Sequence, residues 1–378
     1  MKLDLLYEIQ APKPWGKPHP FGQREAEQRA YFDALEQVQL ADRAGFDTAW
    51  FVEHHFREGR SHMPAPEVVI GALSQTTRRI RLGFGVTLTP HGFTHPARIA
   101  EKVATADILS RGRIEWGTGR STPMERSAFG VPEDRNKEMW REAVATVVQM
   151  WESERFSADT EFLKMPERAI TPKPYQWPHP PAWLAAVSDG SAIAAGHHQL
   201  GLLLMAILTP VEVVQGRIEK YRAAFDEGEP LTRIANNQAA VYTLVHCAPS
   251  MAQAEGYGVW DSVWWWYQHI AEFTLEWEFP HFTQEQKDRQ FPLLAKHRDG
   301  QLDPQEFNDH DMIIVGDADA CLDKLERYRA AGADRLLCYM QFGQLSHESI
   351  LQSIDLMGTQ VIPRLAKSGK RTTIVSGR

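Results

Sequence analysis

Apolar residues along this chain follow two alternating patterns, short runs and longer stretches with helical spacing. The run AWFV at 49–52 is apolar at every position, which suits a strand buried on both faces of a parallel sheet. Stretches between such runs repeat apolar residues as at Tyr31, Leu35 and Val38, which indicates helices. We predict eight strands, at residues 3–9, 48–52, 79–88, 113–117, 182–187, 200–208, 239–247 and 335–342.

Turn-forming residues mark where the predicted helices begin and end. Gly45 follows the first helix, as glycine often does after a last helical residue. Pro96, behind Thr94 and His95, is typical of a first helical position. We predict helices at residues 25–44, 67–76, 96–109, 136–151, 211–225, 318–331 and 346–365, and two more that begin near 191 and 249. Because strands and helices alternate without a linker or repeat, we predict one (β/α)8 TIM barrel over residues 1–378.

Residues 257–311 do not match this alternation, and they are rich in aromatic side chains. These aromatics either bury a lid helix against the barrel or a second subunit, or they form the wall of an apolar substrate pocket. The two uses are compatible, and we expect a lid or insertion that contributes to the pocket. The residues expected to contact substrate are Trp264, Trp265, Trp266 and Phe273.

Composition and charge exclude several classes of partner. The net charge of −8 and the pI near 6.0 argue against nucleic acid and anionic membranes as partners. No apolar run approaches the roughly 20 residues of a membrane helix, and Met1 leads directly into a strand-like run without a signal peptide. Cys247, Cys321 and Cys338 are few and scattered, which fits a reducing cytoplasm rather than a disulfide framework or a zinc site.

Glu53, His54 and His55 come directly after the second predicted strand. Parallel barrels carry their chemistry at the carboxyl ends of their strands, so this position favours a functional role. The alternative is that one histidine caps the strand and the other lies on the surface. Metal binding is disfavoured, because adjacent residues on a strand point to opposite sides, and a turn at Gly92 separates His91 from His95. A histidine beside a cofactor could instead hold a proton near neutral pH.

A second group of polar residues suggests phosphate binding. Ser188 to Ser191 precede a predicted helix, whose free backbone N–H groups favour an anion. Arg120 ends the fourth predicted strand and could supply a fixed positive charge. The serines alone are equally typical of an ordinary helix cap. Together with Arg120 they favour a phosphorylated cofactor, although no separate dinucleotide or triphosphate motif is present.

Four segments in order resemble the bacterial luciferase-like flavin monooxygenases. They are GFDTAWFVEHHF, RIRLGFGVTLTPHGFTHPARIAEKVATADILSRGRIEWGTGR, PAWLAAVSDGSAIAAGHHQLGLL and VGDADACLDKLERYRAAGADRLLCYMQFG. The resemblance covers most of the chain apart from residues 257–311 and the proline-rich middle. It implies a TIM barrel that binds reduced FMN and activates O2 as a flavin C4a-hydroperoxide.

The resemblance also assigns roles to individual residues. His54 matches the catalytic histidine of the family, and His55 is its secondary neighbour. Gly85 and Val86 match the backbone that runs under the flavin ring, in some members through a non-prolyl cis peptide. The residues that match or lie near the flavin-phosphate positions are Arg120, Arg135, Val187, Ser188 and Ser191.

Three departures from the luciferase subunit disfavour long-chain aldehyde bioluminescence. Gly119 replaces a cysteine, Val187 replaces a carboxylate, and two residues are added between Gly85 and His95. The resemblance still implies a cytoplasmic, homodimeric monooxygenase that takes FMNH2 from a separate reductase and oxygenates an apolar or aromatic small molecule. The alternatives are a hydride-transfer enzyme that uses the deazaflavin F420, and a flavin-binding protein without turnover.

Overall fold

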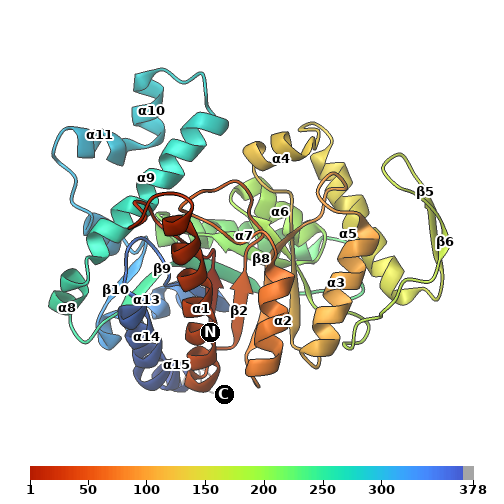
Figure 1. Ribbon diagram of the computed structural model, residues 1–378, viewed down its shortest axis with the longest axis horizontal. Coiled ribbons are helices and arrows are strands. Elements are labelled where there is room, and N and C mark those ends of the chain that lie inside the picture. The colour runs from red at the N-terminus through yellow and green to blue at the C-terminus, as the bar shows by residue number, and fades with distance from the viewer. Residues whose placement is uncertain (369–378) are drawn as a thin grey trace, which may run out of the picture.

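The computed structural model describes residues 1–368, which form a closed barrel of parallel strands surrounded by helices (Figure 1). The strands pair in the order β9, β11, β1, β2, β3, β4, β7 and β8, and a further pairing of β9 with β8 closes the ring. Both the TIM-barrel fold and its eight strands are therefore confirmed. The barrel strands are β1 (Lys2–Tyr7), β2 (Thr48–Phe51), β3 (Arg81–Leu88), β4 (Ile114–Gly119), β7 (Ala182–Ala186), β8 (Gly201–Met205), β9 (Ala239–Cys247) and β11 (Arg335–Tyr339).

Helices cover the outside of the barrel, and the predicted turn residues set several of their ends. Gly45 ends α1 with φ 97°, a left-handed conformation that glycine adopts at little cost. Pro96 begins α3, and His95 caps it by accepting a hydrogen bond from the Ala97 backbone N–H. The outer helices are α1 (Phe21–Ala44), α2 (Pro66–Thr76), α3 (Pro96–Leu109), α5 (Asn136–Glu152), α6 (Asp189–His197), α7 (Val211–Asp226), α8 (Met251–Gly256), α13 (Ala318–Ala330), α14 (His347–Leu356), η1 (Met357–Val361) and α15 (Ile362–Ser368).

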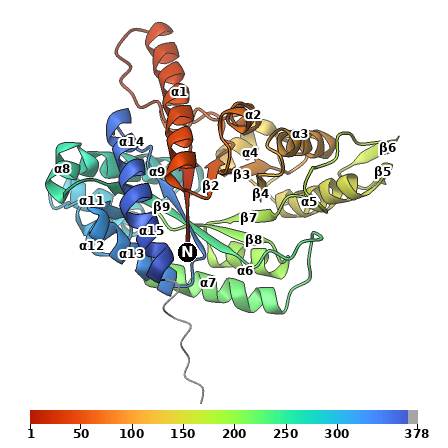
Figure 2. The same cartoon turned by 90° about the horizontal axis from the view of Figure 1, so that it is seen from below.

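Four short elements were not predicted from the sequence. The antiparallel hairpin of β5 (Phe156–Asp159) and β6 (Lys164–Arg168) projects from the side of the barrel (Figure 2). Its second strand, KMPER, has no buried residue, so it lacks the apolar run by which the barrel strands were found. The other two are β10 (Ile314–Gly316), which pairs with β9, and the seven-residue α4 (Pro123–Phe129).

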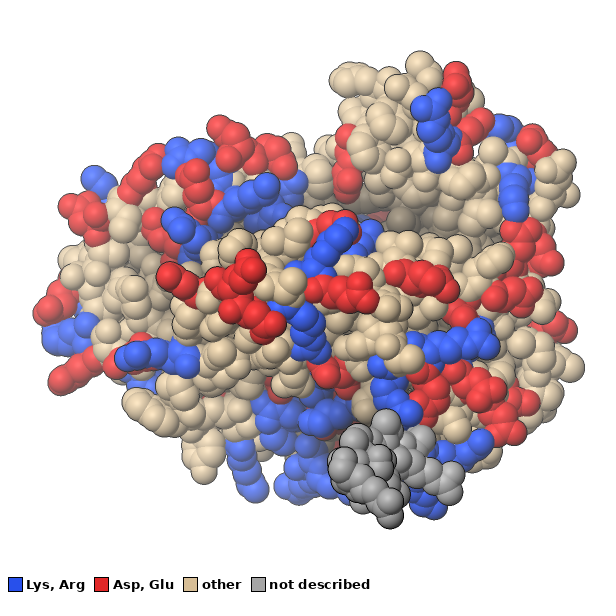
Figure 3. All heavy atoms as spheres, turned by 180° about the vertical axis from the view of Figure 1, so that it is seen from behind, with Lys and Arg blue, Asp and Glu red and all other residues tan. Residues whose placement is uncertain are grey.

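Residues 257–311 form a helical lobe at the carboxyl ends of the strands. Figure 3 shows this lobe standing above the barrel from behind, with acidic and basic side chains mixed over that face. Its long helix touches the loop that follows β11, where the Gln344 backbone N–H donates to Ser262 Oγ at 3.3 Å. The lobe consists of α9 (Val259–Trp277), α10 (Gln284–Gln290), α11 (Pro292–Arg298) and α12 (Glu306–Asp309). Within residues 1–368, no helix is long and apolar enough to cross a membrane.

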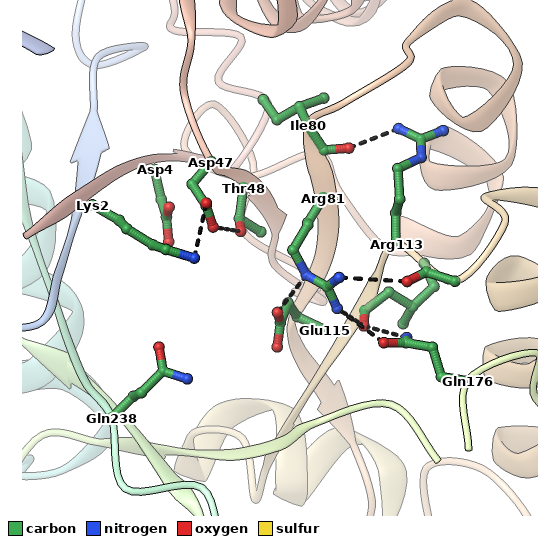
Figure 4. Close-up of polar contacts among 12 residues, drawn as sticks. Lys2, Asp4, Asp47, Thr48, Ile80, Arg81, Arg113, Glu115, Gln176 and Gln238 are labelled. Carbon is green, nitrogen blue, oxygen red and sulfur yellow. Dashed lines mark hydrogen bonds and ion pairs between the residues drawn. The ribbon is translucent and has the colours of Figure 1, made fainter. Parts of the chain in front are cut away.

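The opposite, amino-terminal end of the barrel is closed by ion pairs, and Figure 4 shows the pair between Arg81 and Glu115. Arg335 donates to Asp4 at 2.8 Å and also bonds Asp47, which joins β11 to the starts of β1 and β2. Arg81 donates to Glu115 at 2.5 Å and so joins β3 to β4. Charges buried this deeply are tolerated only when they are paired, and their pairing here fixes the strand ends. These ion pairs therefore hold the strands together at the amino-terminal end of the barrel.

Two glycines allow tryptophans to fill the interior of the barrel. A Cβ on Gly83 would lie 2.3 Å from the Trp50 ring, and a Cβ on Gly201 would lie 2.3 Å from the Trp183 ring. Trp50 and Trp183 pack edge to face with 5.5 Å between their centroids. Because the interior is filled in this way, the barrel is a packed core rather than a channel.

Candidate active site

His54 projects from the end of β2 and forms a hydrogen bond with the carboxylate of Glu125 on α4. His54 Nδ1 lies 3.0 Å from Glu125 Oε1, and the His55 backbone N–H donates to the same oxygen at 2.8 Å. Glu125 is fully buried, whereas the His54 side chain remains 20% exposed. A carboxylate on Nδ1 holds the proton on that nitrogen. His54 Nε2 is therefore the nitrogen that can accept or donate a proton.

Glu125 is held as a carboxylate by donors from two further segments. Thr122 Oγ1 donates to Oε2 at 2.8 Å, Ser121 Oγ also donates to it, and Arg57 Nη2 lies 3.5 Å away. Burial acts to raise the pKa of Glu125, but the His54 imidazole, the Arg57 guanidinium and the Ser121 hydroxyl outweigh it and hold this pKa well below its usual range.

Burial lowers the pKa of His54, and the positive charge of Arg57 lowers it further against the opposing effect of Glu125. His54 is therefore neutral at pH 7, with a lone pair on Nε2. A neutral imidazole oriented in this way can accept a proton from a bound molecule.

His55 has different surroundings from His54. Its ring packs edge-on against Phe129 at 4.8 Å and near Phe56 at 5.9 Å. Its Nε2 lies 3.8 Å from Glu53 Oε1, and Glu53 Oε2 accepts the Leu88 backbone N–H at 3.1 Å. The two imidazoles thus contact different groups, and a direct role for His55 stays a prediction.

The serines that follow β7 cap α6 in a reciprocal arrangement. Ser188 Oγ accepts the Ser191 N–H at 3.3 Å, and Ser191 Oγ accepts the Val187 and Ser188 N–H groups at 3.0 Å each. Ser188 is exposed and Ser191 is half-buried, so both hydroxyls lie at an accessible helix N-terminus.

Arg120 lies beside this turn because β4 and β7 are neighbours in the barrel. Thr118 pairs with Leu184, so continued register places Arg120 next to Ala186. The Arg120 guanidinium donates to Asn136 Oδ1 at 2.7 Å. Burial lowers its pKa, and the nearby charge of Arg126 lowers it further. A half-buried guanidinium next to an exposed helix N-terminus fits a phosphate group.

Strand β3 lies between β2, which precedes His54, and β4, which precedes Arg120, and it packs closely against β4. The peptide bond between Gly85 and Val86 is cis, as the resemblance implied for some members of the family. A Cβ on Gly119 would lie 2.5 Å from Val86 Cγ2, and a Cβ on Gly117 would lie 2.2 Å from the Phe84 carbonyl oxygen. Glycine at 117 and 119 therefore lets β3 and β4 approach closely here.

Arg135, the other basic residue proposed for the phosphate, is engaged elsewhere. Its guanidinium donates to both Glu161 oxygens at 2.8 Å and to Glu138 at 2.7 Å, and it covers the Phe162 ring. It borders a cavity of about 370 Å³ that is lined mainly by charged side chains. The structure therefore does not leave this guanidinium free beside Arg120, and its role in phosphate binding stays a prediction.

The aromatic residues of α9 separate into two groups. Trp266, 1% exposed, packs edge-on to Tyr339 of β11 at 6.3 Å, and Phe273 lies over Arg57 at 4.8 Å. Trp264 instead stacks on His297 of α11 at 4.3 Å, and Trp265 packs on His269 at 4.1 Å. Only the first pair contacts the barrel mouth through these interactions, so Trp264 and Trp265 serve the interior of the lobe.

Three charged residues near His54 were not singled out from the sequence. Glu125 belongs to a capping box with Thr122, and the sequence TPME after a strand could have indicated it. Arg57 and Arg60 follow the histidines directly, but nothing in their spacing distinguishes them from surface arginines. Both are buried in the structure, 8% and 7% exposed.

The larger of the two cavities described here lies beside the site, not within it. It measures about 730 Å³ and lies between α1 and the loops that follow β1 and β11. Its lining includes Gln10 and Gln341, whereas His54, Arg120 and Ser188 do not line it.

A parallel barrel with an oriented histidine and a capped helix N-terminus at the carboxyl ends of its strands has the arrangement of TIM-barrel enzymes, whose active sites lie at that end. The family model of luciferase-like monooxygenases matches residues 17–335. The chain therefore belongs to the luciferase-like monooxygenase family, a family of oxidoreductases, and the predicted resemblance is confirmed.

The chain is similar to members of this family that are named for different cofactors. It is 25% identical, over 91% of this chain and 92% of the other, to the oxygenase component of flavin-dependent trigonelline monooxygenase of Acinetobacter baylyi. It is 34% identical, over 39% of this chain and 46% of the other, to F420-dependent glucose-6-phosphate dehydrogenase of Beutenbergia cavernae. The family thus contains relatives named for a flavin and others named for F420.

Two crystal structures show the same fold at lower identity. Monooxygenase RslO1 from Streptomyces bottropensis superposes with a TM-score of 0.74 at 24% identity, over 96% of this chain and 99% of the other. The oxygenating constituent of 3,6-diketocamphane monooxygenase from Pseudomonas putida, in complex with FMN, gives a TM-score of 0.70 at 19% identity, over 97% and 98%.

Proposed function

We propose that this protein is the oxygenase component of a two-component, FMN-dependent monooxygenase that acts on an apolar or aromatic organic molecule. The observation that carries the proposal is the position of His54, oriented by Glu125, at the same barrel end as Arg120 and the capped N-terminus of α6. Reduced FMN, once bound, would supply the activation of O2.

The residues at the mouth fit FMN in two respects. Ser188, Ser191 and Arg120 would hold the phosphate, since hydroxyls and N–H groups at a helix N-terminus favour an anion. The Gly85–Val86 backbone would lie against the flavin ring, because close approach there needs little side-chain bulk.

His54 would act through Nε2, either accepting a proton from the substrate or returning one to the reacting oxygen. Glu125 would keep Nδ1 protonated and the ring in one orientation. Trp266 and Phe273 on α9 would exclude water above the reacting atoms.

Two partners belong to the same proposal. A separate reductase would supply FMNH2, as expected for a chain similar to a protein described as an oxygenase component. We also propose a cytoplasmic homodimer, on the basis of the family resemblance.

The test is oxygen consumption by the purified protein with FMN and an added flavin reductase, followed by mass spectrometry of a panel of organic acids, ketones and aromatics. The proposal expects incorporation of one atom from ¹⁸O2 into a product. It expects His54→Asn to abolish the product while FMN still binds. Release of all the oxygen as H2O2 across the panel would contradict it.

An F420-dependent hydride transfer is the second candidate, because a relative 34% identical over part of the chain is named for that cofactor. Reduced FMN and reduced F420 can be compared by the rise in melting temperature that each gives, since a ligand stabilises the state that it binds. A rise with F420 alone would favour hydride transfer. Flavin binding with no effect of His54→Ala on any turnover would favour a binding protein.

A further inference from the structure

Arg57 and Arg60 lie three residues apart on the loop after β2, and both are more than nine-tenths buried. Among the described residues, Arg57 Nε and Arg60 Nε and Nη1 have no hydrogen-bond partner. Guanidinium N–H groups are rarely left unpaired away from water, because they lose strong hydrogen bonds there. These donors therefore indicate a group that the protein itself does not supply.

The faces of the two guanidiniums are covered, while their edges carry the unpaired donors. Phe273 lies 4.8 Å from Arg57 Cζ, and Trp266 lies 5.2 Å from Arg60 Cζ. Aromatic rings satisfy the face of a guanidinium but not its in-plane N–H groups. A planar anion that binds edge-on would accept hydrogen bonds from the unpaired N–H groups of both guanidiniums, and neither aromatic ring would have to move.

The carboxylates nearby do not saturate these arginines. The Glu125 oxygens accept hydrogen bonds from His54, the His55 N–H, Ser121 and Thr122. Their contacts with Arg57 are longer, at 3.5 Å. Glu8 meets Arg60 at 3.4 Å through one oxygen, and its other oxygen has no hydrogen bond within residues 1–368. Both contacts are longer than the usual 2.7–2.9 Å of a charge-assisted hydrogen bond.

The loop that carries the arginines is fixed in place. Ser61 Oγ donates to the Glu8 carbonyl at 2.9 Å, and the His62 N–H donates to the Ile9 carbonyl at 3.0 Å. The unpaired donors are thus held in a preorganised position, which lowers the cost of binding a ligand. Arg57 Nε also lies 3.5 Å from the Glu125 oxygen that His54 Nδ1 contacts, which places the Arg57 guanidinium near the proposed catalytic histidine.

We propose that Arg60 and Arg57 bind a carboxylate of the substrate, which is therefore an aromatic or unsaturated carboxylic acid rather than a neutral hydrocarbon. The inference rests on the proposed monooxygenase function and narrows its substrate class. The carboxylate takes the free guanidinium edges, and the unsaturated body packs beside Trp266 and Phe273 near His54. Because the carboxylate adds a negative charge near His54, its binding favours the protonated imidazole.

Calorimetric titration of the intact protein tests this proposal without turnover. The probes are benzoate and cinnamate, each matched with its neutral amide, with and without FMN. The proposal expects each acid to bind about tenfold or more tightly than its amide, a difference of the size that a charge-assisted pair gives. Arg60→Gln is expected to remove this preference and leave amide binding within about threefold.

Two further variants make the result specific. Arg60→Lys keeps the charge and should restore part of the preference. Arg98→Gln removes an equal charge from an exposed α3 residue that pairs with Glu101 at 2.7 Å, and it should behave as the parent protein. Circular dichroism and the melting temperature establish that each variant is folded.

Equal affinity for acids and amides, or a preference that survives Arg60→Gln, overturns the proposal, as does the absence of binding by both acids at about 10 mM. These outcomes are separate from the failure of the proposed function. FMN binding and oxygen consumption are measured on the same preparations, and loss of those with an intact acid preference would overturn only the monooxygenase chemistry.

Discussion

Glu125 determines what His54 can do, although it is distant in sequence and lies on a helix of only seven residues. It accepts hydrogen bonds from His54, the His55 N–H, Ser121 and Thr122, so all its neighbours are donors. A carboxylate is the side chain that can satisfy this set, because it has only acceptor sites. The orientation of the histidine therefore depends on the charge state of one buried residue.

Glu125→Gln replaces one acceptor with an NH2 group that faces donors. We expect the free energy of unfolding to fall by about 2 kcal/mol, because a buried donor is left unpaired. Turnover should fall by about tenfold or more, because the Nδ1 proton of His54 is no longer held by a negative charge. Urea unfolding and oxygen incorporation measure the two effects.

Glu133→Gln is the matched control for that variant. Glu133 pairs with Arg126 but is 70% exposed, so its loss should leave both measurements close to those of the parent. Unchanged turnover in Glu125→Gln would contradict the role assigned to this carboxylate.

His246 on β9 provides a pH-dependent contribution to stability away from the site. Its ring is fully buried, and neither ring nitrogen has a hydrogen-bond partner within residues 1–368. Burial lowers its pKa to about 4, whereas the unfolded chain titrates near 6.5. Between these values the unfolded state binds the extra proton, so the stability falls as the pH falls.

His246→Leu should remove that dependence. At pH 5 the parent is expected to lose about 2 kcal/mol from this residue relative to pH 7, and the variant should not show this loss. The measurement is urea unfolding at both pH values, with the exposed His281→Gln as control. An identical pH dependence in parent and variant would rule out His246 as the source.

At the scale of elements, the orientation of α9 determines which of its aromatic side chains contact the mouth of the barrel. Trp266 and Phe273 are seven residues apart, which places them about two turns apart on one face of the 19-residue helix. The sequence carried that spacing, but three consecutive tryptophans gave no indication of which face meets the barrel. The orientation is set by tertiary contacts with Tyr339 and Arg57, which no local pattern encodes.

Trp266→Ala should open the site to water. We expect a smaller share of the consumed oxygen to appear in product and a larger share as H2O2, because a dry pocket protects the reactive flavin. A loss of about 3–5 kcal/mol in unfolding free energy should accompany the cavity. Peroxide assays with a reductase measure the partition.

Trp277→Ala is the control on the same helix, since Trp277 is 38% exposed. Its peroxide yield should match that of the parent. If the two variants released equal amounts of peroxide, the mouth-facing position of Trp266 would have no bearing on coupling.

At the scale of the whole molecule, the barrel could be predicted because its strands are buried on both faces. Runs such as TAWF of β2 and GLLLM of β8 are apolar almost throughout, and turn residues separate them from amphipathic helices. The exposed β5–β6 hairpin and the lobe of α9 to α12 lack that contrast. The serine cap of α6 was predictable because it is local, whereas Glu125, Arg57 and Arg60 act through contacts between segments that only the closed barrel brings together.

The proposed flavin site also spans two neighbouring strands, and Arg120→Ala tests it. The affinity for FMN should fall by about tenfold to a hundredfold, because a charge-assisted pair with the phosphate is lost. Riboflavin, which lacks that phosphate, should bind as it does to the parent. Flavin fluorescence titration measures both affinities.

Arg135→Ala is the comparison, since Arg135 is already paired with Glu161 and Glu138. It is expected to leave FMN affinity unchanged. A similar loss in this variant would instead assign the phosphate to both arginines, and a loss of riboflavin affinity in Arg120→Ala would argue for a general distortion.

The ion pair between Arg335 and Asp4 joins the last barrel strand to the first. While the chain is being synthesised, β1 cannot pair with β11, which is made more than 300 residues later. Until β11 emerges from the ribosome, the sheet is open, and the edges of β1 and β9 can pair with other chains. The contact that closes the finished barrel therefore forms last, and the nascent chain depends on chaperones to prevent pairing with other chains. We expect the yield of folded protein in cells to rise with chaperone supply, by more than the stability of the folded protein alone would predict.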